Sequence, residues 1–135
     1  MSEIVELIKS IPDVAYIEGC TDEQIAEAEK ELGLKFPQEY IDYVKEFGCV
    51  DFFGHEFTGL NVIGRLNVVQ ATKKEKRVNE YFVDDLIVLE NVGIDAIVIC
   101  ISIDNVVFRV CYDKIEKIAD SLSGYVNDCL KKKEK

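Results

Sequence analysis

The sequence predicts an α+β fold in which helices pack mainly on one face of an antiparallel sheet. Apolar residues recur every three or four positions near both ends of the chain, and they alternate with other residues through much of the middle. These periods are typical of helices and strands, respectively. Helical segments precede, interrupt and follow the strand segments, which is the order of an α+β layer. At 135 residues the chain is most simply one domain, which we expect to span residues 1–135 and to end in a short basic tail, 131–135.

The first predicted element is a short amphipathic helix that Pro12 ends. Its apolar residues fall at helical spacing and consist of Ile4, Leu7, Ile8 and Ile11.

A helical hairpin is predicted next, between Thr21 and Gly48. Thr21 and Gln24 match a capping box, in which each side chain accepts a hydrogen bond from an otherwise unpaired backbone amide. Gly33 supplies the left-handed residue that commonly follows a helix. Pro37 opens the second helix at a position that tolerates a missing amide, and Gly48 ends it. The apolar stripe of this second helix consists of Tyr40, Ile41, Val44 and Phe47.

Residues 49–60 change to a period of two and predict two short strands. Gly54-His55 is a plausible two-residue turn between them, with glycine first. In that register Phe52 faces Phe57 on the buried side, whereas Phe53 points the other way.

The second half of the chain predicts a helix at 67–78, a strand at 86–90 and a strand pair at 96–103 and 106–112. Asp104-Asn105 would join the pair. One face of the pair is then almost wholly large and apolar, and we expect it to form the core; it consists of Ile97, Ile99, Ile101, Ile103, Val106, Phe108, Val110 and Tyr112.

A final helix is predicted over about 121–131. It would bury one stripe, which consists of Leu122, Tyr125, Val126, Cys129 and Leu130.

Composition limits the classes of partner. The formal charge is −10, from 26 acidic and 16 basic residues, and such a field repels phosphate and attracts basic partners. The basic cluster at 73–77 is small and has no interleaved aromatic residues, so nucleic-acid binding is not expected. No apolar run approaches the roughly 20 residues that span a bilayer, so no membrane contact is expected. Five scattered cysteines without a C-x-x-C pair, and an N-terminus unlike a signal peptide, are typical of the reducing cytoplasm.

Catalytic motifs are not found. His55 is the only histidine, so a two-histidine metal site cannot be built, and a Ser-His-Asp triad would depend on a single turn residue. The glycine motifs that hold nucleotide phosphates are not present. Asp84-Asp85 and Asp113 are more typical of turns than of an acid/base pair. We therefore expect no enzyme activity, no cofactor and no metal.

The hairpin at 21–48 resembles the opening of the SUKH superfamily, which includes the Smi/Knr cell-wall regulators and many bacterial immunity proteins. The matching residues are Leu32, Gly33, Phe36, Pro37 and Tyr40, and the resemblance extends more weakly over roughly residues 3–130. It implies a SUKH-like fold and a bacterial cytoplasmic immunity protein that neutralises a cognate secreted or contact-dependent toxin by direct binding. The alternative it implies is a non-catalytic interaction module of the Smi/Knr regulatory type.

The toxin-binding surface is predicted to combine the less apolar face of the sheet with the acidic hairpin around Gly54. Phe53 would be an aromatic anchor with Asp51 and Glu56 beside it and Asp84 and Asp85 nearby, since anchors rimmed by charge are typical of binding hot spots. The alternative is that Phe53 packs under a neighbouring helix and the acids are solvated loop residues. The expected partner is a protein toxin, for which a basic nuclease is one candidate, and the chain itself would be a monomer or weak dimer.

Overall fold

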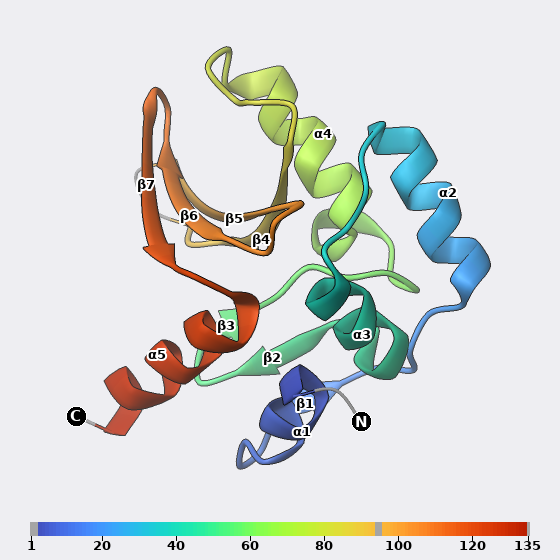
Figure 1. Cartoon of the computed structure of the whole chain (residues 1–135), viewed down its shortest axis with the longest axis vertical. Helices are drawn as coiled ribbons and strands as arrows, with labels where there is room; N and C mark the ends of the chain where they lie inside the picture. Colours follow the sequence, from blue (N-terminus) through green and yellow to red (C-terminus); the bar gives the residue numbers. More distant parts are fainter. Residues whose placement is uncertain (1–2, 94–95, 135) are drawn as a thin grey trace.

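The computed structural model describes residues 3–93 and 96–134. Its elements follow in the order α1 Glu3–Lys9, β1 Ala15–Tyr16, α2 Asp22–Leu32, α3 Gln38–Phe47, β2 Val50–Phe52, β3 His55–Glu56, a 3-10 turn η1 Gly64–Leu66, α4 Val68–Val78, β4 Leu86–Asn91, β5 Ile97–Ser102, β6 Val107–Cys111, β7 Lys114–Ala119 and α5 Leu122–Glu134. The predicted α+β class with antiparallel strands is confirmed. The strands divide between two sheets, β1-β2-β3 and β4-β5-β6-β7, where one was expected (Figure 1). The predicted basic tail continues α5 as far as Glu134, and residue 135 lies outside the described part of the chain.

The helical hairpin forms as its end signals predict. Thr21 Oγ1 accepts from the backbone amide of Gln24 at 3.1 Å, and the Gln24 side chain accepts from the Thr21 amide at 2.8 Å, so the capping box is complete. Gly33 ends α2 in the left-handed region, at a φ of 68°. Pro37 lies one position earlier than predicted: it is the capping residue before α3, and Gln38 is the first helical residue.

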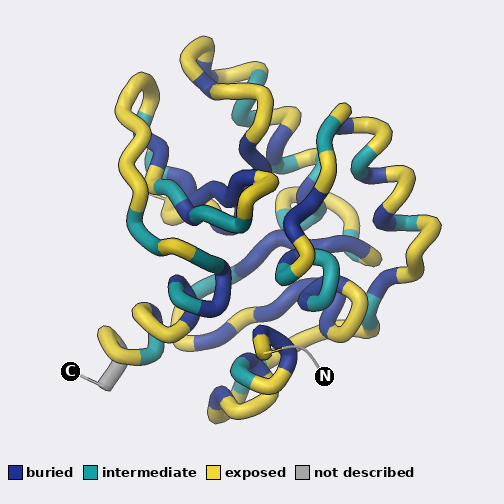
Figure 2. The backbone as a smooth tube through the Cα atoms, in the orientation of Figure 1, coloured by how far each residue is buried: buried dark blue, intermediate teal, exposed yellow. Residues whose placement is uncertain are grey.

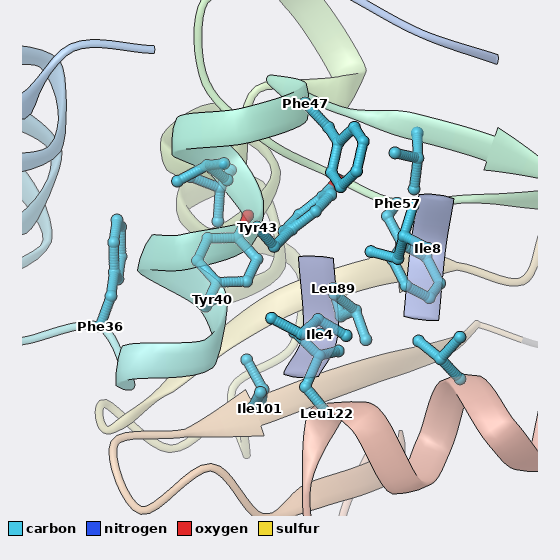
Figure 3. Close-up of a cluster of buried hydrophobic side chains, with 14 of the residues drawn as sticks. Ile4, Ile8, Phe36, Tyr40, Tyr43, Phe47, Phe57, Leu89, Ile101 and Leu122 are labelled. Carbon is cyan, nitrogen blue, oxygen red and sulfur yellow. The ribbon is translucent and has the colours of Figure 1, made fainter. Parts of the chain in front are cut away.

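The main hydrophobic core lies where α1, α3 and α5 meet the two sheets. Figure 3 shows Tyr40, Tyr43 and Phe47 of α3 projecting from one helix face toward side chains of α1, β4, β5 and α5. Tyr43 is fully buried although it was not part of the predicted stripe, while the predicted Ile41 is only partly buried. The wide buried face allows one helix to contact both sheets.

The β2–β3 hairpin turns one residue earlier than predicted. Phe52 pairs with His55, so the two turn residues are Phe53 and Gly54 rather than Gly54-His55. Both have positive φ, 48° and 85°, as a type I′ turn requires at its two central positions. The predicted contact between Phe52 and Phe57 is nevertheless present, with ring centroids 5.2 Å apart.

The β5–β6 pair is shifted by one residue from the predicted register. Ile101 pairs with Val107, because the connection uses three residues, 103–105, instead of the predicted Asp104-Asn105. Asn105 adopts a φ of 69° at the end of this loop, as is common in three-residue hairpin loops. Because side chains alternate between faces, a one-residue shift moves every β6 side chain to the other face. The predicted single core face is therefore wrong: Ile103 is 48% exposed.

Both faces of the four-stranded sheet carry apolar side chains. One face joins the main core, and the other forms a second cluster against α4, which consists of Phe82, Leu86, Val88, Val98, Cys100 and Val110 with Ala71 and Phe108 at its margin. β4 and β5 are thus buried, whereas β7, which was not predicted as a strand, is exposed along most of its length (Figure 2).

Thr58 joins α3 to β4 inside the core. Its amide donates to the Leu89 carbonyl at 2.7 Å, and its hydroxyl donates to the Val88 carbonyl at 2.7 Å. The hydroxyl has one proton, so the Tyr40 phenol, 2.9 Å away, must donate to it. Tyr43 donates to the Thr58 carbonyl at 2.6 Å. One buried residue therefore connects the loop after β3 to a helix and to the second sheet.

Replacing Thr58 with valine should lower the free energy of unfolding by about 2–6 kcal/mol. The change keeps the shape but leaves the Tyr40 hydroxyl and the Val88 carbonyl buried without this partner, and each lost partner costs about 1–3 kcal/mol. Urea unfolding measures the difference. Thr58→Ser is the control, which keeps the hydroxyl and should lose only about 1 kcal/mol for one methyl group. An equal decrease in the free energy of unfolding in the two variants would show that the hydrogen bonds of the Thr58 hydroxyl contribute nothing to stability.

Candidate functional site

A β-bulge in β4 directs the Glu90 side chain into the main core. Val88 pairs with Cys100, but Glu90 pairs with Ile99, so Leu89 is the extra residue. Regular alternation would place Glu90 on the same face as Val88, against α4. The bulge instead places Glu90 on the face of Leu89 and Ile99. The result is a carboxylate that is only 5% exposed.

Glu90 meets three polar side chains there. His55 Nδ1 lies 3.1 Å and 3.2 Å from its two carboxylate oxygens. Tyr125 donates its phenol proton to Oε2 at 2.6 Å. Cys129 Sγ lies 3.9 Å from His55 Nδ1. We call His55, Glu90, Tyr125 and Cys129 the Glu90 cluster.

Local structure positions each member of the Glu90 cluster. His55 is the first residue after the Phe53-Gly54 turn, and its ring lies against Phe52 at a centroid distance of 5.3 Å. Tyr125 and Cys129 are four residues apart on α5, so they share one helix face.

The start of α5 is held by a separate polar contact. Glu39 of α3 accepts from the Ser123 amide at 3.1 Å and from the Asn105 side chain at 2.8 Å. Asn105 in turn accepts from the Leu122 amide at 3.4 Å. A carboxylate at a helix N-terminus is favourable because it satisfies free amides and the helix dipole. This contact therefore helps to position α5, the helix that carries Tyr125 and Cys129.

The Glu90 cluster favours a positively charged His55. The Cys129 sulfur and the Glu90 carboxylate, both beside Nδ1, raise the pKa of His55 to about 10, against the opposing effect of burial. Burial and the adjacent Glu90 charge also raise the pKa of Tyr125 well above its ordinary value. Near neutral pH the cluster is therefore an imidazolium paired with a buried carboxylate, which a neutral phenol also stabilises.

The donor atoms of His55, Glu90 and Cys129 all lie within 4.8 Å of one another, so these residues could hold a metal ion. The single histidine excluded a two-histidine site, and the predicted place of His55 in the hairpin turn gave no sign that these three residues would meet. One signal was visible: Glu90 ends the apolar run LIVLE of a predicted strand, and a carboxylate in such a run needs a partner if it is buried.

Three of the five predicted binding residues lie together on the β2–β3 hairpin. Asp51 pairs with Glu56 across the strands, and Phe53 lies at the tip with 38% of its surface exposed. Glu56 is not a free acid, because Arg65 forms a double contact with its carboxylate at 3.0 Å and 3.1 Å. The acidic rim of Phe53 is therefore weaker than predicted.

Asp84 and Asp85 do not lie beside Phe53. They precede β4, whose far end contacts β3 through Glu90 and His55. They lie five and six residues before Glu90, and at about 3.3 Å per extended residue this corresponds to roughly 17–20 Å. In Figure 1 the loop before β4 lies at the opposite end of the molecule from β2 and β3. Asp84 and Asp85 therefore either form a remote part of the predicted binding surface or belong to a different surface.

A cavity of about 770 Å³ opens beside Glu56, between α4 and the sheets. Its charged lining residues are Glu56, Arg65, Lys73, Lys74, Glu75 and Arg77. The predicted basic cluster at 73–77 thus borders the hairpin, so this side of the hairpin is mixed in charge rather than acidic.

Comparison with known proteins identifies a family. A family model described as SMI1-KNR4 cell-wall matches residues 1–131, nearly the whole chain. The resemblance predicted from the 21–48 hairpin is thereby confirmed. No curated protein matches the chain. Within the described part of the chain, none of the helices has the length and apolar character needed to cross a membrane.

The raised pKa of His55 predicts a pH dependence of folding stability. The pKa of His55 in the folded chain, about 10, exceeds its ordinary value of about 6.5. The contribution of protonated His55 to the free energy of unfolding is therefore complete below about pH 6.5 and is lost as pH rises toward 10. In Glu90→Gln the carboxylate charge is gone, so the His55 pKa should fall and this loss of stability between pH 6.5 and 10 should shrink. His55 is the only histidine, so its NMR signal gives the pKa directly in chelator-treated protein. An unchanged pKa in the variant would contradict the ion pair.

The backbone of the hairpin tip gives a second prediction. Phe53 has a φ of 48°, a region in which asparagine is far more common than other non-glycine residues. Phe53→Asn and Phe53→Ala both remove the ring, but Asn-Gly is the preferred pair for this turn. The asparagine variant should therefore be about 0.5–1 kcal/mol more stable than the alanine variant in urea unfolding. Equal stability would mean that the turn carries no strain.

Proposed function

Since the chain belongs to the SMI1-KNR4 cell-wall family, we propose that it is a bacterial immunity protein that acts in the cytoplasm. It would bind a cognate toxin directly and block the surface that the toxin needs. Blocking of this kind requires no catalysis, and we propose that the chain is not an enzyme. The acidic charge of −10 favours a basic toxin, such as a nuclease, because opposite charges speed association.

The observation that carries the proposal is the placement of Phe53, an aromatic side chain that is 38% exposed, at the tip of the β2–β3 hairpin. The turn holds the Phe53 backbone at positive φ, and His55, the first residue after the turn, contacts the buried Glu90. Strained backbone that the surrounding structure holds in place is common at binding sites. An aromatic ring that is already ordered loses little conformational entropy on binding, which makes it a good anchor. Asp51 lies beside it on the exposed face of β2.

A second candidate function is favoured by the family itself, which is described by reference to the cell wall. In this case the chain would be a non-catalytic module that recruits a cellular partner. Deletion of its gene would then alter the cell wall or signalling, and the cell would not poison itself.

The deciding experiment expresses the C-terminal domain of the protein encoded immediately upstream of this chain's gene. We expect that domain to stop growth and the present chain to restore it. The two purified proteins should also form a complex whose association slows as salt increases, because screening weakens the attraction between opposite charges. Growth that stops and is not restored would contradict the immunity function for this pair.

Variants of Phe53 test the binding surface separately. Phe53→Ala and Phe53→Asn should each weaken toxin binding at least about tenfold, or about 1.4 kcal/mol, although they differ in stability. Tyr112→Ala is a matched control, because Tyr112 is also an exposed aromatic residue at positive φ. It should bind as the parent does. Rescue by all three variants with unchanged affinity would retain the function but exclude Phe53 as the anchor.

A further inference from the structure

The Glu90 cluster has the geometry of a metal site that is nearly assembled. Tetrahedral zinc with bonds of about 2.0–2.3 Å keeps its donor atoms about 3.3–3.6 Å apart. His55 Nδ1 lies 3.1 Å from Glu90 Oε1 and 3.9 Å from Cys129 Sγ, and all three donors lie within 4.8 Å of one another. Movements on the order of 1 Å would bring all three to one ion.

The kinds of donor identify the kind of cation. One thiolate, one imidazole and one carboxylate form a set that zinc accepts, whereas magnesium and calcium prefer oxygen donors alone. Three protein donors leave a fourth tetrahedral position for water or another ligand. We propose that His55, Glu90 and Cys129 bind a zinc ion, independently of any role in toxin binding.

The surroundings of the donors support this assignment. Tyr125 holds Glu90 Oε2 at 2.6 Å, so that oxygen is oriented while Oε1 is available to the metal. Hydrogen bonds to ligating carboxylates and imidazoles commonly orient metal ligands in this way. Phe52 packs against the His55 ring and restricts its rotation. Glu90 and Cys129 are buried, and the His55 side chain, which is 30% exposed, is the part of the site closest to solvent.

Binding would connect three segments that are far apart in the sequence. His55 belongs to β3, Glu90 to β4 and Cys129 to α5. The ion takes the place of the imidazole proton and of the thiol proton, because metal ligands must be deprotonated. Without the metal, the ion pair between His55 and Glu90 occupies the same position. Since only the folded chain brings the donors together, zinc should raise the melting temperature.

The experiment adds zinc, or cobalt(II) as a spectroscopic substitute, to chelator-treated protein kept reduced. We expect one metal ion per chain and, with cobalt, the charge-transfer absorption of a thiolate ligand together with the strong visible bands of a tetrahedral site. Cys129→Ser should lose the thiolate absorption. Cys100→Ser is the control, because Cys100 is a buried thiol in the second cluster and not near His55; it should keep the absorption. Absence of the thiolate absorption in the wild-type protein, or its persistence in Cys129→Ser, would overturn the site.

Two further measurements do not depend on the cysteine variants folding. The ring signals of His55, the only histidine, should shift on zinc addition to wild-type protein, and unchanged signals would overturn the proposal. Tyr125→Phe should keep the thiolate absorption but weaken zinc binding about 10–100-fold, because only the orienting hydrogen bond is lost. Unchanged affinity in that variant would exclude Tyr125 as a positioning residue.

Discussion

The structure depends on how the middle of β4 satisfies its backbone groups. At the bulge the regular ladder to β5 is interrupted between Val88 and Glu90, and the residues there are buried. Thr58 supplies partners for the Val88 and Leu89 carbonyls, while the Thr72 hydroxyl accepts from the Val88 amide at 3.0 Å. Because buried backbone groups without partners are costly, these threonines make the bulge possible. They also attach α4 and the loop after β3 to the second sheet.

The same irregularity produces the polar cluster. A strand with regular alternation would send Glu90 toward α4, on the face that carries the second apolar cluster. The bulge sends it toward His55, Tyr125 and Cys129, where the charge is paired and hydrogen-bonded. A buried ion pair is costly to break, because removal of one partner leaves the other charge uncompensated. The hairpin that presents Phe53 is thus attached to the core by the residue that follows its turn. The β2–β3 hairpin and the buried face of α5 are coupled through a single carboxylate.

Local signals predicted the helices well and the strand pairings less well. The capping box of Thr21 and Gln24 and the left-handed Gly33 depend on residues a few positions apart, so they form as the sequence indicates. Strand register depends on the length of the connecting loop, and a one-residue change inverts a strand. Two residues were expected between β5 and β6 and three are used, so Phe108 and Val110 pack against the α4 side rather than in the main core. The short β1 and the exposed β7 lacked a clear alternation of apolar residues and were missed.

The sequence by itself determined the α+β class, the positions of the helices and, through the residues at 32–40, the family, because each of these is encoded in short-range patterns of caps, periods and spacing. It also indicated an aromatic residue in the β2–β3 hairpin, although the turn lies one residue earlier than expected. Only the tertiary structure separated Asp84 and Asp85 from Phe53, paired Glu56 with Arg65, and assembled His55, Glu90 and Cys129. The physical reason is that an irregularity in a strand decides which face of the sheet a side chain occupies. In addition, partners that are 35 and 74 residues apart produce no periodic pattern in the sequence.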